Sequence, residues 1–278
     1  MASPVLGVDG DVGLRILSAI LGWTYFFAWS TSFYFKCVLL NYQRKFVGGL
    51  SIDYVNLNFL GHTSYAVYAL FFFYNPAIQD EYRRRHGGHN NSVQLNDVAF
   101  SCHAATLALF TLLQTYWYPR APGQRLSLFN SLLISLVFLI AASNLFAVAM
   151  GAEQGIDFLY LISYFKLYVT IAKFIPQVWN NFRRKSTVGW SIGNIVLDLT
   201  GGILSFVQLM IDAYRSDDWT AVTGNPVKFA LSWLSILFDI VFMVQHFILY
   251  PDRTDNSLLH KETVPVQQEH PDERTPLL

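Results

Sequence analysis

One carboxylate, that of Asp198, lies inside a strongly apolar stretch of the chain at 192–211. An ionisable side chain in a membrane helix is costly, and it normally faces a water-filled path or a partner charge. A carboxyl group in such a place can exchange a proton between two compartments, because burial and nearby charges tune its pKa. The residue predicts proton-coupled transport.

Two further acids share this setting. Asp97 stands at the start of the apolar stretch 98–118, and Asp239 lies within the stretch 228–250. Asp97 follows Asn96 at a helix start, so a helix N-cap worth about 1 kcal/mol is the alternative role. Asp239 could equally pair structurally with a lysine. Both acids join Asp198 as candidates for proton coupling.

Polar side chains near these acids could bind a charged substrate. Lys166 and Lys173 are seven residues apart, which places them two turns apart on one helix face. Each could meet a substrate carboxylate or balance Asp198, and snorkelling to the membrane interface is the alternative. Asn194 precedes Asp198 by four residues and shares its helix face. We therefore treat Asn194 and the two lysines as candidates for substrate binding.

The composition places these residues in a membrane protein. Of 278 residues, 53% are hydrophobic and 14% charged, and the mean hydropathy is +0.33. A soluble domain carries about 25% charged residues. The formal net charge of 0 gives no sign of nucleic-acid binding, and Cys37 and Cys102 both fall in apolar stretches, which predicts no disulfide framework. The sequence shows no metal-ligand spacing, nucleophile triad or phosphate loop, so we expect neither an enzyme nor a cofactor.

Apolar stretches long enough to cross a bilayer, about 20 residues each, occur seven times. They cover residues 14–34, 54–74, 98–118, 126–150, 159–179, 192–211 and 228–250. The first lacks a charged n-region and a small-residue cleavage site, so we interpret it as a helix rather than a signal peptide. Short connections join the stretches, which predicts one membrane domain over 1–250 and a cytosolic tail over 251–278.

Lysine and arginine concentrate in the connections after the first, third and fifth stretches and in the tail. Under the positive-inside rule this predicts a luminal N-terminus and a cytosolic C-terminus. The opposite side holds fewer, among them Lys228 and the cluster at 83–85, which runs against the rule. The same connection as that cluster carries the sequon Asn90-Asn91-Ser92, where a luminal face would allow glycosylation of Asn90.

A repeat with an offset of 140 residues organises the stretches. The matched pairs are Asn41 and Asn181, Arg44 and Arg184, Lys45 and Lys185, Gly49 and Gly189, Ser51 and Ser191, Ile52 and Ile192, Leu57 and Leu197, and Gly61 and Gly201, with a weaker echo of Gln114 in Gln245. Asn58 falls opposite Asp198, which makes Asn58 a substrate-binding candidate from the other half.

An odd number of stretches separates the copies, so the two units run parallel. We predict an all-α membrane protein on a 3+1+3, SWEET-like plan. Two three-helix bundles would cover 14–118 and 159–250, and a linker helix would cover 126–150. The substrate site is expected near the midplane between the halves.

The surroundings of Asp198 carry a more specific motif. The pair Pro176-Gln177, the basic turn after it and the run 191–202 resemble the PQ-loop family. The likeness extends over about 20–250 and includes the segments 22–23, 28–30, 96–98, 238–239 and 245–247. Within that family the chain is similar to the cystinosins, the lysosomal cystine–proton symporters.

The resemblance implies export of L-cystine with protons from a lysosome or vacuole to the cytosol, with Asp97 and Asp198 as the coupling acids. Cystine is a zwitterion with two ammonium and two carboxylate groups. A site of amides, lysine and carboxylates suits it, whereas a sugar would leave the desolvated charges unpaired. The expected binding residues are Asn58, Tyr164, Lys166, Lys173, Asn181, Asn194 and Asp198.

Proline removes a backbone donor and permits a hinge in a membrane helix, so Pro176 and Gln177 are predicted to form one. The first repeat departs from the pattern, because Lys36 and Cys37 stand at the corresponding positions. We expect the first half to flex differently, or Lys36 to snorkel to the interface.

The tail ends in an acidic dileucine pattern, with Glu273, Leu277 and Leu278. Such patterns are read by clathrin adaptors, and this one predicts delivery to a lysosomal or vacuolar membrane. Two alternatives to cystine transport remain. One is a PQ-loop transporter for cationic amino acids or sugars, and the other is a nutrient-sensing scaffold that binds ligand and recruits a cytosolic signalling complex with little flux.

Overall fold

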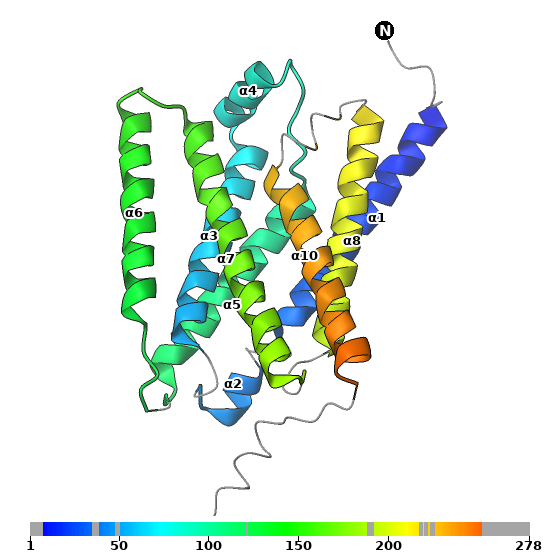
Figure 1. Cartoon of the computed structure of the whole chain (residues 1–278). Helices are drawn as coiled ribbons and strands as arrows, with labels where there is room; N and C mark the ends of the chain where they lie inside the picture. Colours follow the sequence, from blue (N-terminus) through cyan, green and yellow to red (C-terminus); the bar gives the residue numbers. More distant parts are fainter. Residues whose placement is uncertain are drawn as a thin grey trace, which may run out of the picture.

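The computed structural model describes residues 8–34, 39–47, 51–120, 122–187, 192–216, 219, 222 and 226–251. Every regular element in these ranges is a helix, which confirms the predicted all-α fold (Figure 1). The helices are α1 (Val8–Phe33), α2 (Leu39–Arg44), α3 (Ile52–Tyr74), α4 (Pro76–Arg85), α5 (Leu95–Trp117), α6 (Leu128–Ala149), α7 (Gly155–Arg184), α8 (Ile192–Ser216), α10 (Pro226–Val244) and η2 (Gln245–Leu249). The predicted roles of Lys36, Cys37, Glu273, Leu277 and Leu278 concern positions outside the described residues.

Capping boxes begin two of the long helices. The backbone N–H of Gln94 donates to Asp97 Oδ2 (2.8 Å) at the start of α5, and that of Gln154 donates to Asp157 Oδ2 (3.4 Å) at the start of α7. Such reciprocal bonds satisfy N–H groups that the helix leaves unpaired. Gln94 is therefore the N-cap residue of α5, and the alternative N-cap role for Asp97 is wrong: this acid lies inside the first turn.

Six helices are long and apolar enough to cross a membrane, by length and composition: α1, α5, α6, α7, α8, and α10 with η2. The predicted stretch 54–74 falls in α3, which has 23 residues but is not among these six. The chain is thus a multi-pass membrane protein, while seven spans and the orientation of the termini stay predictions. Helix α7 continues past its predicted end at 179, because arginines suit a helix C-terminus and Lys185 closes it in the left-handed conformation (φ 51°).

Six helices form a closed bundle around a polar centre. Helix α3 packs between α5 and α7, α1 packs between α5 and α8, and α10 packs between α7 and α8. Helix α6 stands at the edge of the bundle beside α7 (Figure 1). None of the α6 residues is buried within the chain, so its leucine and phenylalanine side chains form an apolar surface suited to lipid.

The 140-residue offset recurs in three-dimensional contacts. A β-carbon on Gly61 would lie 3.2 Å from Val169 of α7, and one on Gly201 would lie 2.5 Å from Trp29 of α1. Gly201 stands 140 residues after Gly61, and Val169 stands 140 residues after Trp29. The two contacts therefore involve corresponding positions of the repeat. These glycines let α3 approach α7, and α8 approach α1, more closely than a larger residue would.

Two further features recur in both halves, with Asn41 and Lys45 each 140 residues before its counterpart and the glutamine partners, Gln114 and Gln245, 131 residues apart. Asn41 Nδ2 donates to Gln114 Oε1 (3.1 Å), and Asn181 Nδ2 donates to Gln245 Oε1 (3.0 Å). Lys45 and Lys185 both adopt positive φ, 48° and 51°. The recurrence agrees with the predicted parallel repeat, although the division into 3+1+3 rests on the sequence.

The arginine cluster that runs against the predicted orientation lies on α4. Each arginine is paired with an acid: Arg83 with Asp80, Arg84 with Glu81, and Arg85 with Glu81 and Asp157. The bond from Arg85 to Asp157 (2.6 Å) raises the pKa of Arg85 and ties α4 to the start of α7.

Candidate substrate cavity

A cavity of about 1000 Å³ lies among the six helices of the bundle. Small-molecule pockets typically measure about 300–1,000 Å³, so this one can hold a metabolite. Its lining includes most of the predicted site residues, namely Asn58, Asp97, Lys166, Lys173, Gln177, Asn194, Asp198 and Asp239.

Asp198 and Asp239 approach each other across the interface between α8 and α10. Ser235 Oγ donates to Asp198 Oδ1 (3.0 Å) and also contacts Asp239. Asp239 is 1% exposed, and its Oδ2 has no hydrogen-bond partner among the described residues. The Asp239 carboxyl interacts electrostatically with both Asp198 and Lys173. Two neighbouring buried carboxylates repel each other when both are ionised, and a proton or a substrate ammonium can relieve that repulsion.

Asp97 forms a second, self-contained cluster. Lys228 Nζ lies 2.9 Å from Asp97 Oδ1, and both side chains are 2% exposed. Tyr25 donates its hydroxyl to the same carboxylate, and the Gln94 backbone supplies a third donor. The charge of Asp97 is therefore balanced, in contrast to the pair formed by Asp198 and Asp239.

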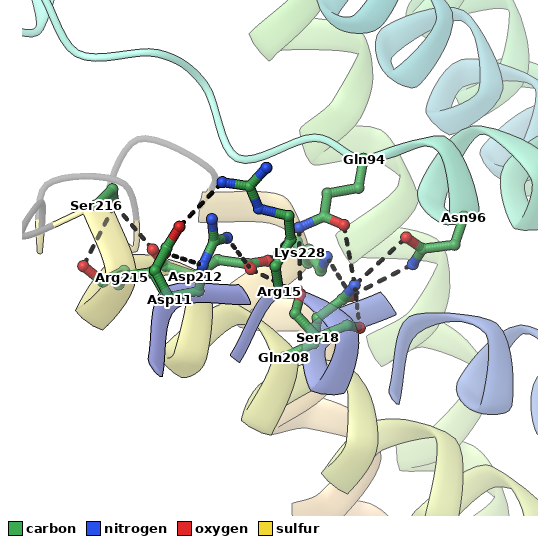
Figure 2. A network of polar contacts seen from close by, with 11 residues as sticks. Asp11, Arg15, Ser18, Gln94, Asn96, Gln208, Asp212, Arg215, Ser216 and Lys228 are labelled. Atoms are coloured by element: carbon green, nitrogen blue, oxygen red, sulfur yellow. Dashed lines mark hydrogen bonds and ion pairs between the residues drawn. The ribbon is translucent and has the colours of Figure 1, made fainter. Parts of the chain in front are cut away.

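A polar network extends from Lys228 toward one end of the bundle (Figure 2). Lys228 Nζ donates to Gln208 Oε1 (3.0 Å), and Gln208 Nε2 donates to the backbone oxygen of Ser18 (3.0 Å). Asp212 accepts from Ser18 Oγ (2.7 Å) and from Gln94. The network ties α1, α5, α8 and α10 together between the large cavity and a polar pocket of about 340 Å³ that Gln94 and Asp212 also line. It lies at the end of the cavity where Lys228 lines the wall.

Lys166 is buried on the α7 side of the cavity. Its Nζ lies 3.2 Å from Nε2 of His62 on α3, and the two side chains are 9% and 4% exposed. The burial of Lys166 among helices contradicts the alternative of interfacial snorkelling. Lys173 likewise lines the cavity and contacts the ring of Phe174 at 4.2 Å.

Two predicted substrate-binding residues, Tyr164 and Asn181, do not line the cavity. Tyr164 is 49% exposed, and Tyr168, one turn further, lines the cavity instead. Asn181 is 2% exposed and is engaged by Gln177 Nε2 (2.9 Å), which itself lines the cavity. Asn90 is exposed in the connection after α4, where its Oδ1 accepts from Arg83 (3.2 Å).

Lys228 and His62 are the main cavity residues that sequence reasoning does not identify. Lys228 is the first residue of the predicted stretch 228–250 and is counted with the charges on one side of the membrane, whereas the structure buries it in α10. Pro226 is the available signal, because proline favours the first turn of a helix and so places Lys228 inside one. His62 has no distinctive spacing, and only the packing of α3 on α7 reveals it.

The chain matches the family model described as "PQ loop repeat" over residues 38–78 and 158–218. It is 43% identical over 237 residues to "Cystinosin" of Bos taurus, covering 85% of this chain and 64% of that protein. It is 40% identical over 244 residues to "Cystinosin homolog" of Arabidopsis thaliana, covering 87% and 89%. A "Cystine transporter" of Saccharomyces cerevisiae is 26% identical over 256 residues, covering 84% and 94%.

This chain thus spans slightly less than two thirds of the length of its bovine relative but most of the length of the plant one. The two matched PQ-loop segments fall in the two predicted repeats. With identity of about 40% along nearly the whole plant protein, the chain belongs to the cystinosin family of PQ-loop membrane proteins.

Proposed function

We propose that this chain is a secondary active transporter that exports L-cystine, together with protons, from the lumen of an acidic organelle to the cytosol. The observation that carries the proposal is the cavity in which Lys173 interacts with the buried Asp239, which also interacts with Asp198. The amides of Asn58 and Asn194 line the same space.

The charges in the cavity complement those of cystine. Moving a charged group out of water is costly unless an opposite charge and hydrogen bonds replace the water. Asp198 can pair with a substrate ammonium and Lys173 with a carboxylate, while Asn58 and Asn194 offer both donors and acceptors. The name of the yeast relative, a cystine transporter, supports the same substrate.

We assign the transported proton to the pair of acids formed by Asp198 and Asp239. Because Asp198 and Asp239 interact electrostatically, protonation of either relieves repulsion between two neighbouring carboxylates. Asp198 is the coupling acid, with Asp239 as its partner. Asp97 is a second coupling acid, whose release from Lys228 would loosen the polar network at one end of the cavity.

Alternating access would come from rocking of the two three-helix units, 14–118 and 159–250, about this cavity. Pro176 and Gln177 would serve as a hinge in α7. The N-terminus would be luminal, with a glycan on Asn90, and the motif of Glu273, Leu277 and Leu278 would direct the protein to a lysosomal or vacuolar membrane through a clathrin adaptor.

The full-length chain reconstituted in proteoliposomes tests this function. Uptake of radiolabelled L-cystine should rise when the outside is acidic and collapse with a protonophore. Lysine, arginine and glucose in excess should not compete. Competition by lysine or arginine would indicate a transporter of cationic amino acids. Saturable cystine binding without flux would indicate a sensing scaffold, and either result overturns the proposal.

A further inference from the structure

We infer that His62, together with Lys166, forms a second carboxylate subsite in the cavity and that His62 determines specificity for substrates with two amino-acid ends. The inference rests on the proposed function, because it assumes that the cavity binds a substrate such as cystine. It assigns to His62 a role separate from the cluster around Asp198.

The packing of α3 on α7 creates the subsite. A β-carbon on Gly61 would lie 3.2 Å from Val169 and 3.5 Å from Lys166 Cδ, so a larger residue there would push the two helices apart. The next residue, His62, therefore reaches the Lys166 ammonium. The Phe33 ring meets the imidazole edge-on at 5.3 Å and holds its orientation.

The hydrogen-bond roles of the two side chains follow from their chemistry. When Lys166 is protonated its ammonium only donates, so Nε2 of His62 accepts at 3.2 Å and the ring proton is on Nδ1. His62 Nδ1 is buried and has no partner among the described residues, although the residue lines the cavity. An unpaired buried donor costs free energy, and an oxygen acceptor in the cavity would recover it.

Lys166 adds positive charge to the same place. It forms no ion pair within 4.0 Å among the described residues, although it feels the more distant charge of Asp198. An ammonium and an imidazole N–H, side by side and with no acid within ion-pair distance in the described part of the chain, together suit a carboxylate. Neither group suits a substrate ammonium, which fixes the polarity of this end of the cavity.

The spacing of the two lysines suggests a substrate with two acidic ends. Lys173 lies seven residues after Lys166 on α7, about 10 Å along the helix axis. Lys173 belongs to the cluster with Asp198 and Asp239, and Lys166 belongs to the subsite with His62. Cystine carries a carboxylate at each end of a chain with a disulfide at its centre, so one molecule can engage both lysines.

The test compares two probes that differ by one carboxylate: L-cystine and the mixed disulfide of L-cysteine with cysteamine. Proteoliposomes of the full-length chain carry wild-type protein, His62→Phe or His62→Asn. Phenylalanine keeps an aromatic ring but has no donor, and asparagine keeps a donor near the Nδ1 position. His103→Phe is the matched control, because His103 lies on α5 and does not line the cavity.

We expect His62→Phe to raise the KM for cystine on the order of tenfold, the effect of losing a hydrogen bond to a charged group. The KM for the mixed disulfide should stay unchanged, and His62→Asn should restore part of the cystine affinity. Equal losses for both probes, or no loss for either, would overturn the inference.

Binding of both probes to detergent-solubilised protein, measured by calorimetry, separates this result from failure of the proposed function. If cystine binds but is not transported, the function is overturned, while the His62 comparison still decides the subsite. If wild-type protein binds neither probe, both conclusions are overturned. Unfolding temperatures of all variants exclude a general folding defect.

Discussion

The indole Nε1 of Trp29 donates a hydrogen bond of 3.1 Å to the backbone oxygen of Asp198, across the interface between α1 and α8. Gly201 lies against the same indole: a β-carbon there would come within 2.5 Å of Trp29 Cδ1 and Nε1. Trp29 therefore sets the position of the segment of α8 that carries the candidate coupling acid.

Replacing Gly201 by alanine should disturb this contact. The added methyl group has no room, so the indole or α8 must shift, and overpacking of this kind costs about 1–3 kcal/mol. We expect Gly201→Ala to lower the unfolding temperature in detergent and to reduce cystine uptake. The control is Gly13→Ala in α1, where an added β-carbon would meet nothing within 4 Å. Equal stability of the two variants would contradict the role given to this contact.

The sequence correctly predicts that Asp198, Lys166 and Lys173 line the cavity, but it wrongly predicts Tyr164 instead of Tyr168. The angular position of each residue around its helix explains the difference. Residues seven apart return to nearly the same helix face, so both lysines line the cavity. Residues four apart advance by about 40° around the axis. The tyrosines at 160, 164 and 168 consequently drift around α7, and only Tyr168 faces the cavity.

The pairing of Asp97 with Lys228 could not be predicted from the sequence. Lys228 and Asp97 are 131 residues apart and meet only because α5 and α10 both contact the Gln208 region of α8. The repeat, by contrast, is visible in the sequence and carries over to contacts such as those of Gly61 and Gly201. Local patterns thus predict helices and their repetition, while partners across the bundle require the packed structure.

Lys228→Met should be strongly destabilising. It leaves the Asp97 carboxylate buried without its cation, and breaking a buried pair in this way costs about 3–5 kcal/mol. The double variant with Asp97→Asn should recover much of the loss, because no buried charge remains. Thermal unfolding of the single and double variants measures both effects.

The matched control is Arg15→Ala, which removes an ion pair to Asp11 whose side chains are 67% and 38% exposed. Exposed pairs contribute little to stability, so this variant should unfold close to the wild-type temperature. If Lys228→Met also unfolds close to the wild-type temperature, then the ion pair with Asp97 does not stabilise the bundle.

Asp198→Asn should uncouple transport from the proton gradient. The amide cannot take up a proton, so the proton gradient no longer drives transport and accumulation of cystine against its gradient should be lost. Exchange of cystine for cystine, which needs no net proton movement, should persist at saturating cystine, with a raised KM because Asp198 also pairs with a substrate ammonium. The control is Asp80→Asn on α4, whose side chain is 62% exposed. Full accumulation by Asp198→Asn would remove this residue from the coupling mechanism.

Replacing Asn181 distinguishes a structural role of this residue from a role in substrate binding. Its amide donates to Gln245 Oε1 (3.0 Å) and accepts from Gln177 (2.9 Å), and its side chain does not line the cavity. Asn181→Ala leaves a buried polar partner unsatisfied, at a cost of about 1–3 kcal/mol. We expect a lower unfolding temperature and an unchanged KM for cystine.

Asn58→Ala provides the opposite case, because Asn58 lines the cavity. Asn58→Ala should raise the KM for cystine with little change in stability.

The bond from Asn41 to Gln114 recurs at Asn181 and Gln245, so Gln114→Ala and Gln245→Ala should destabilise the protein to a similar extent if the halves are structurally related. A raised KM for Asn181→Ala at wild-type stability would instead return Asn181 to the substrate site, because only a direct contact would affect affinity alone.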